Sequence, residues 1–174
     1  RGDNDGWTPL HYLCGSKNIV DTVSLDILGL LLERCPEAAQ RAAGDGDLPI
    51  HLAACTPKSP EFCRVLIEAY PGSEKIVASG CGLLPIHFAC KGGTVETVQH
   101  LLRLYPESIN VADGHGSYPI HNSIFGLKSR NNNPAAAAEM VQFLLDSDPN
   151  VASQKWDGQF PLVTVFIYAC NNRN

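Results

Sequence analysis

Apolar residues recur along this chain at the spacing of amphipathic helices, in four segments separated by polar stretches. Within each segment the apolar residues are mainly three or four positions apart, which places them on one face of a helix as an apolar stripe. The pattern therefore predicts four helices whose apolar faces form the core. The stripes are Leu25, Leu28, Leu31 and Leu32; Cys63, Leu66 and Ile67; Val95, Val98, Leu101 and Leu102; and Ala138, Val141, Leu144 and Leu145.

A second pattern is a short motif in which glycine stands three residues before proline and histidine two residues after it. The prolines of successive copies of this motif are 40, 36, 34 and 42 residues apart, and recurring units of this length indicate a solenoid. Because proline suits the first turn of a helix, each copy predicts the start of a first helix. The starting prolines are Pro9, Pro49, Pro85, Pro119 and Pro161, and Val163 replaces the histidine in the last copy.

A further proline follows each apolar stripe and predicts where the second helix of a unit ends. These prolines are Pro36, Pro71, Pro106 and Pro149. The segment after each of them, such as 107–112, is expected to be extended and to run into a glycine-rich tip. Glycines supply the positive φ angles of a tight turn, so the link between units is predicted to be a β-hairpin-like finger.

The joint between the two helices of a unit varies in length, and the polar segment 128–133 is expected to be a loop there. Pro57, Pro60 and Pro134 fall in these joints, with Pro60 at the N-terminal edge of a second helix. The chain is predicted to be one mainly all-α array of four to five units. Their approximate bounds are 5–42, 43–78, 79–112, 113–154 and a partial 155–174. The apolar run 165–168 is unlike a polar terminal cap, so we expect an excerpt of a longer chain.

The first copy of the motif reads Asp3-Asn-Asp-Gly-Trp-Thr-Pro-Leu-His11, which is the full ankyrin pattern. The chain thus resembles the ankyrin-repeat family over nearly its whole length. This resemblance implies helix-turn-helix units joined by hairpin fingers and stacked into a curved α-solenoid that binds other proteins on its concave face. The threonine before proline is replaced in the later copies, as in the divergent arrays common in protists and algae. The replacing residues are Leu48, Leu84, Tyr118 and Phe160.

The resemblance also implies that a partner binds at the finger tips and at the exposed ends of the first helices. By repeat register these positions are Asn4, Asp5, Trp7, Asp45, Asp47, Cys81, Leu83, Lys91, His115, Ser117, Phe125, Trp156 and Asp157. Trp7 and Trp156 are candidate anchors because aromatic residues dominate binding hot spots, and packing on the array ends is the alternative. Acidic tips suggest a basic or mixed-charge partner.

The repeated histidines invite a metal or catalytic interpretation, but a structural one is favoured. Equivalent residues in such a stack lie about 8–10 Å apart, whereas zinc needs its ligand atoms at about 2 Å. Each ring is therefore expected to bridge backbone groups of neighbouring units. The motif residues with expected structural roles are Gly6, Pro9, His11, Gly46, Pro49, His51, Gly82, Pro85, His87, Gly116, Pro119, His121, Gly158 and Pro161.

The composition of the chain argues against several classes of partner and site. The formal net charge is −5 without a clustered basic face, which argues against a nucleic-acid partner. The apolar runs are far shorter than the ~20 residues that span a bilayer, so membrane insertion is not expected. Seven scattered cysteines without a CxxC pair indicate neither a disulfide framework nor a zinc site, and favour a reducing intracellular setting, cytoplasm or nucleus.

No pairing of nucleophile and base stands out, and the Gly-x-Gly tips lack the Lys-Ser/Thr of a phosphate loop. We therefore expect no catalytic residue, metal or cofactor, and a protein-binding scaffold that is monomeric in the full chain. One alternative is a regulatory or targeting module of an enzyme whose catalytic domain lies outside this sequence. Another is a spacer without a partner of its own.

Overall fold

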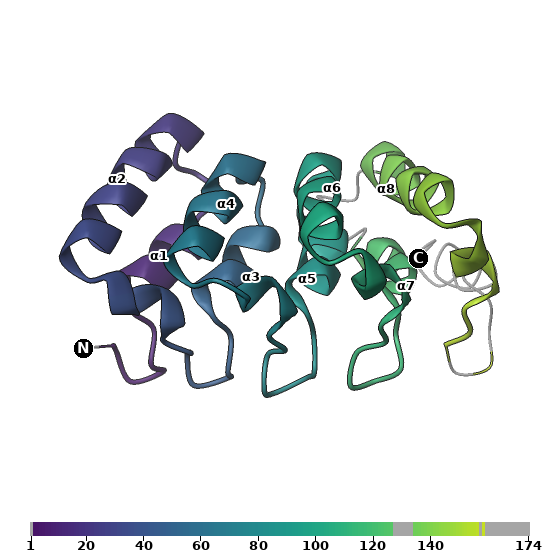
Figure 1. Cartoon of the computed structure of the whole chain (residues 1–174), viewed down its shortest axis with the longest axis horizontal. Helices are drawn as coiled ribbons and strands as arrows, with labels where there is room; N and C mark the ends of the chain where they lie inside the picture. Colours follow the sequence, from purple (N-terminus) through teal and green to yellow (C-terminus); the bar gives the residue numbers. More distant parts are fainter. Residues whose placement is uncertain (1, 127–133, 157, 159–174) are drawn as a thin grey trace, which may run out of the picture.

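The computed structural model describes residues 2–126, 134–156 and 158. In this part of the chain, four pairs of helices stand side by side in one row, and a narrow loop projects from the same edge between successive pairs (Figure 1). The helices are α1 (Pro9–Gly15), α2 (Asp21–Arg34), α3 (Pro49–Ala54), α4 (Pro60–Ala69), α5 (Pro85–Gly92), α6 (Val95–Leu104), α7 (Pro119–Phe125) and α8 (Pro134–Ser147). The predicted all-α solenoid is confirmed.

Each first helix begins at its motif proline, as predicted. The preceding residue is extended, for example Leu84 with a ψ angle of 160°, which is the conformation that a following proline favours. The histidine two residues after the proline then accepts a hydrogen bond from that preceding residue, with 3.0 Å between Leu84 N and His87 Nδ1. Proline and histidine together therefore fix where the helix starts. Pro161 lies outside the described residues.

Each second helix ends two residues before its stop proline. The residue between them, such as Tyr105 after α6, leaves the helical region because the ring of Pro106 crowds it. The segment after each stop proline contains a 3-10 helix and is not extended throughout, which corrects the sequence-based expectation. After Pro106 the proline starts the turn and Ser108 Oγ donates to Tyr105 O at 2.6 Å, and the backbone is extended only from Val111. These 3-10 helices are η1 (Pro36–Gln40), η2 (Ser73–Lys75), η3 (Pro106–Asn110) and η4 (Pro149–Ser153).

Two details of the second helices also differ from expectation. Pro134 is the first residue of α8 and does not precede it, since its fixed φ suits that position. Ala138 is exposed, and the buried face of α8 runs through Ala137, Met140 and Leu144. Only the first member of the predicted stripe is wrong, because Leu144 is buried and Val141 and Leu145 pack against the core.

The core is a continuous row of buried side chains from both helices of each pair. Leu28, Leu66, Leu101 and Leu144 are each at most 2% exposed and pack against the first helices beneath them. Each unit therefore buries its apolar face against its neighbours, as a solenoid does.

The fingers are tight turns closed by backbone hydrogen bonds, as the hairpin-like prediction requires. We number them by residues: first finger 3–7, second 43–47, third 78–83 and fourth 113–117. In the second finger, Ala43 N donates to Asp47 O and Gly46 N to Ala43 O, both at 2.9 Å. Gly46 has a φ of 86°, which favours glycine at the turn. Neighbouring fingers are joined as well, because Gly44 N donates to Asp5 O at 2.8 Å.

Candidate functional site

The repeated histidines hold the base of the array together. His51 Nδ1 accepts the N–H of Leu48 at 2.9 Å, and its Nε2 lies 2.9 Å from Ile76 O. Because Nδ1 is the acceptor, Nε2 carries the proton and donates to that carbonyl. The ring thus ties the start of a first helix to the segment that enters the next finger. His11 and His87 make the same two contacts, with Asp47 O and Val111 O as the carbonyls.

These rings are not available to a metal or a substrate. All four motif histidines are fully buried, and both ring nitrogens of three of them are engaged. His121 Nδ1 accepts from Tyr118 N at 3.2 Å, and its Nε2 is buried on the side of Gln154. Nowhere in this described part do three His, Cys, Asp or Glu side chains gather as metal ligands would.

Burial of these rings makes the stability of the array depend on pH. Burial lowers the pKa of His11, His51, His87 and His121, and that of His51 to about 4. Unfolded histidine titrates near pH 6.5, so between that value and about 4 the unfolded chain binds more protons than the folded one. Acidification from pH 7 to pH 5 should therefore destabilise the fold, with His51 alone contributing about 2 kcal/mol.

Asp47 has the opposite effect on the stability of the fold over part of the same pH range. Burial and the neighbouring Asp45 raise the pKa of Asp47 to about 6, so the folded chain gains a proton below that pH and is stabilised relative to the unfolded chain. We expect urea titrations to show a steeper loss of stability between pH 7 and pH 5 in Asp47→Asn than in the wild type. Equal slopes for the two proteins would contradict this assignment.

A hollow of about 410 Å³ opens between the third and fourth fingers. Its walls come from three parts of the chain: the two fingers, the ends of α5 and α7, and the segment after η4. Among the lining residues, Leu83, Phe125 and Trp156 are apolar, while Lys91 and His115 carry polar nitrogens at the rim. The full lining is Cys81, Leu83, Lys91, Asp113, His115, Ser117, Asn122, Phe125 and Trp156.

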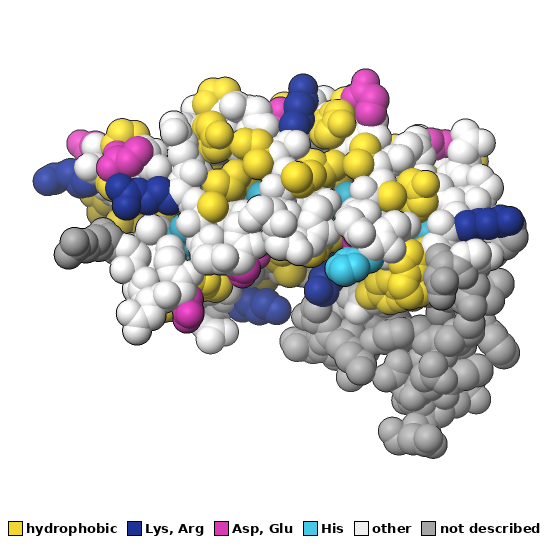
Figure 2. All heavy atoms as spheres, turned by 90° about the horizontal axis from the view of Figure 1, so that it is seen from below, with side chains coloured by type: hydrophobic (Ala, Val, Ile, Leu, Met, Phe, Trp, Pro, Cys, Tyr) yellow, Lys and Arg dark blue, Asp and Glu magenta, His cyan; other side chains and the backbone are white. Residues whose placement is uncertain are grey.

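The aromatic wall of this hollow is held in place by specific contacts. The rings of Phe125 and Trp156 meet edge to face, with centroids 5.1 Å apart. Trp156 Nε1 donates to His115 O at 3.1 Å, which joins the wall to the tip of the fourth finger. Both rings are therefore oriented without a ligand. Seen from the finger side, hydrophobic side chains form several separate patches, and one of these patches lies beside a histidine (Figure 2).

Of the two charged groups at the hollow, the Asp113 carboxylate is already hydrogen-bonded and the Lys91 ammonium group is not in an ion pair with a described residue. The Asp113 carboxylate is occupied by its own finger, because Oδ1 accepts the N–H groups of His115 and Ser117, both at 2.9 Å. Asn122 Nδ2 donates to the other oxygen of Asp113 at 3.4 Å. Lys91 is exposed and forms no ion pair with any residue that the structure describes. The ammonium group of Lys91 is therefore the available charge at the rim.

Seven of the predicted partner-binding positions line this hollow together. They are Cys81, Leu83, Lys91, His115, Ser117, Phe125 and Trp156. Asn4, Asp5 and Asp45 lie exposed at the first two finger tips, and Asp47 is half-buried beside them. Asp157 lies outside the described residues.

Trp7 is placed differently from Trp156. Its ring packs on Tyr12, with centroids 5.2 Å apart, and against Gly15 at the end of α1. Trp7 is thus at the opposite end of the row from the hollow, and it covers the first helix.

Sequence reasoning missed two residues of the hollow, Asp113 and Asn122. Asp113 had a detectable signal, since aspartate at the start of a finger caps the turn by accepting backbone N–H groups. Asp3 does the same in the first finger, where Oδ1 accepts from Asp5 N and Trp7 N. Nothing in the sequence indicates Asn122, because it reaches the hollow only through the position of α7.

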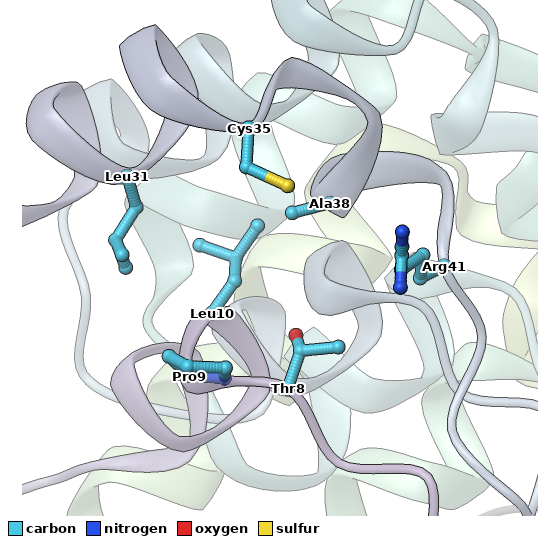
Figure 3. Close-up of a pocket in the computed structure, with 7 residues that line it drawn as sticks. All are labelled: Thr8, Pro9, Leu10, Leu31, Cys35, Ala38 and Arg41. Carbon is cyan, nitrogen blue, oxygen red and sulfur yellow. The ribbon is translucent and has the colours of Figure 1, made fainter. Parts of the chain in front are cut away.

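A second, apolar hollow of about 220 Å³ lies at the N-terminal end of the row, between α1, α2 and η1 (Figure 3). Leu10 and Leu31 approach each other across it, and Pro9 forms its edge. Pro9 is exposed, whereas its equivalents Pro49, Pro85 and Pro119 are buried beneath the preceding unit. No described residue of another unit covers this hollow on that side. Its lining contains Thr8, Pro9, Leu10, Leu31, Cys35, Ala38 and Arg41.

Three of the cysteines that the structure describes, Cys14, Cys35 and Cys63, are held in the thiol form by their surroundings. Cys14 and Cys63 are fully buried as free thiols, and burial raises the pKa of Cys63 to about 12. Cys35 donates to the Glu37 carboxylate, and this hydrogen bond raises its thiol pKa. A raised pKa keeps a thiol protonated and unreactive at neutral pH.

The geometry of the row agrees with comparisons to known proteins. Residues 76–121 match a family model described as ankyrin repeats in many copies. A chain in the solved complex of a predatory endopeptidase from Bdellovibrio bacteriovorus with an immunity protein has a TM-score of 0.67 and 21% identity, covering 98% of this chain and 79% of that one. No curated protein matches the sequence. The resemblance to ankyrin repeats is confirmed, and such repeats are protein–protein interaction modules that generally lack catalysis.

In the described part of the chain, no helix has both the length and the hydrophobicity needed to cross a membrane.

Proposed function

We propose that this chain is a non-catalytic scaffold that binds a protein or peptide across its concave face, formed by the finger tips and the ends of the first helices. One observation carries the proposal: positions assigned to binding by repeat register alone meet in a single hollow with an ordered aromatic wall. A concave, mainly apolar site with a few polar groups at its rim is the usual form of a binding site.

The hollow is suited to anchoring a partner side chain. Its aromatic residues are held by contacts with each other and with the fourth finger. A partner therefore does not have to order them, which reduces the entropic cost of binding. Aromatic residues in such a setting are the ones that alanine scanning most often finds to dominate affinity.

The proposal predicts that binding depends on Phe125 and Trp156. Peptides selected from a displayed random library on the intact chain should lose about 30-fold in affinity, or about 2 kcal/mol, when both residues are replaced by alanine. Fluorescence anisotropy with the selected peptides measures this change, and circular dichroism shows that the variant is folded. Leu30→Ala is the matched control, because Leu30 is 61% exposed on α2. Affinity that survives the double substitution would rule out the hollow as the anchor.

A further inference from the structure

We call the surface formed by the four finger tips and the ends of the first helices the finger face. Its exposed acidic side chains at the tips lie at the first two fingers. Asp5 and Asp45 are exposed at the first two tips, and Asp47 lies half-buried beside Asp45. The apolar hollow is at the other end, between the third and fourth fingers. A partner that covers both regions must therefore be asymmetric itself.

The Asp47 carboxylate stands out among the acidic groups of this face. Asp113 and Asp3 both use their carboxylates within their own fingers, and Asp3 also accepts the hydroxyl of Tyr12. Asp47, in contrast, has no hydrogen bond to its carboxylate and no ion pair among the described residues. A half-buried carboxylate without a partner is costly, and a cation from outside would relieve that cost.

The acidic pair and the hollow are close enough for one peptide segment to reach both. Lys91 lines the hollow, and its charge also reaches Asp47, where it partly offsets the rise in the pKa that burial and Asp45 cause. Adjacent units of such a stack are about 8–10 Å apart, and an extended peptide rises about 3.3 Å per residue. Roughly three to five residues therefore separate a side chain in the hollow from one at Asp47.

Lys91 also influences where along the finger face a cationic side chain of the partner can bind. Because its ammonium group lies at the rim, it repels a cation placed directly over the hollow. At Asp45 and Asp47 two carboxylates outweigh the repulsion from this single ammonium group, so a cationic side chain is favoured on the side of the second finger.

We propose that the finger face binds an extended segment of a partner protein that places a large apolar side chain in the hollow and a Lys or Arg side chain, about three to five residues away, at Asp45 and Asp47. This inference rests on the proposed function and adds the chemistry and polarity of the partner to it. The shape of the hollow selects the apolar residue, and the unpartnered carboxylate selects the cation.

The test uses peptides selected from a displayed random library on the intact chain. Peptides that bind should share an aromatic or large aliphatic residue and a Lys or Arg at the stated distance. The variant Asp45→Asn, Asp47→Asn should weaken them about tenfold at low salt, with the loss shrinking as salt is added. Asparagine retains the side-chain oxygen that caps the finger at Asp45, so the variant should stay folded.

Two controls separate this inference from the proposed function. Asp26→Asn, Glu33→Gln removes two exposed charges from α2 and should leave affinity unchanged. A peptide whose Lys or Arg is replaced by alanine should bind the wild type and Asp45→Asn, Asp47→Asn equally.

The outcomes are distinguishable. Selected peptides without a shared cation, or insensitive to the Asp45 and Asp47 substitutions, overturn the polarity of the partner and leave the scaffold function standing. Peptides insensitive to Phe125→Ala, Trp156→Ala overturn the anchoring hollow, and a library that gives no specific binder contradicts both proposals.

Discussion

Replacing Gly93 by alanine should lower the free energy of unfolding by about 3 kcal/mol, although the change adds only one methyl group. Gly93 is buried at the end of α5, where a Cβ would lie 2.2 Å from Ala54 O and 3.0 Å from Ala89 O. Both are backbone atoms, so neither can rotate away. The φ angle of Gly93 is −84°, which alanine adopts freely, so the expected loss comes from the clash alone.

Gly29→Ala makes the same chemical change and is expected to have the opposite effect. Gly29 lies within α2, and a Cβ there meets nothing within 4 Å. Alanine should stabilise the fold by about 0.5–1 kcal/mol, because glycine inside a helix loses more backbone entropy on folding. Urea titrations of both variants measure the difference. If Gly93→Ala were as harmless as Gly29→Ala, the close approach of α5 to α3 would not exist in solution.

Leu101→Ala is expected to destabilise the array by about 2–5 kcal/mol, as truncation of a buried leucine does. Leu101 is 2% exposed on α6 and belongs to the core shared by the third and fourth units. Because each unit contacts only its neighbours, the cavity cannot be filled by distant parts of the chain. Chemical denaturation followed by circular dichroism measures the loss.

The repeat supplies a matched control for this substitution. Leu31 stands five residues before its stop proline, as Leu101 does, but it is half-buried at a hollow that no other described unit covers. Leu31→Ala removes the same atoms with fewer neighbours around them, so it should cost less than half as much. Equal losses at the two positions, or a loss below about 0.5 kcal/mol at Leu101, would be incompatible with this packing.

The helix starts could be predicted from the sequence because proline acts on its immediate neighbours. Pro85 fixes its own φ and holds Leu84 extended, and this local effect needs no other unit. Residues 107–110 were wrongly expected to be extended, since the 3-10 helix there also depends on burying Ser108 and Ile109 against the stack. The first member of the α8 stripe was wrong for the same reason, because packing decides between Ala137 and Ala138.

In the candidate site, too, some features could be predicted from the sequence and others depend on how the units pack. Repeat register placed Cys81 at a finger tip and Lys91 and Phe125 at the ends of first helices, but it gave no distance between them. The hollow arises from how the third and fourth units stack and from where the segment after η4 brings Trp156. Register also treats all units alike, so it could not separate the end position of Trp7 from the wall position of Trp156.

By itself, the sequence determined where each described first helix starts, where each second helix stops, and which residues occupy equivalent positions. Those features follow from backbone restrictions that proline and glycine impose over a few residues. Only the tertiary structure decided that Leu31 is half-exposed while Leu101 is buried, and that seven predicted residues share one hollow. Burial and enclosure depend on what the neighbouring unit covers, and residues far apart in the chain supply that cover.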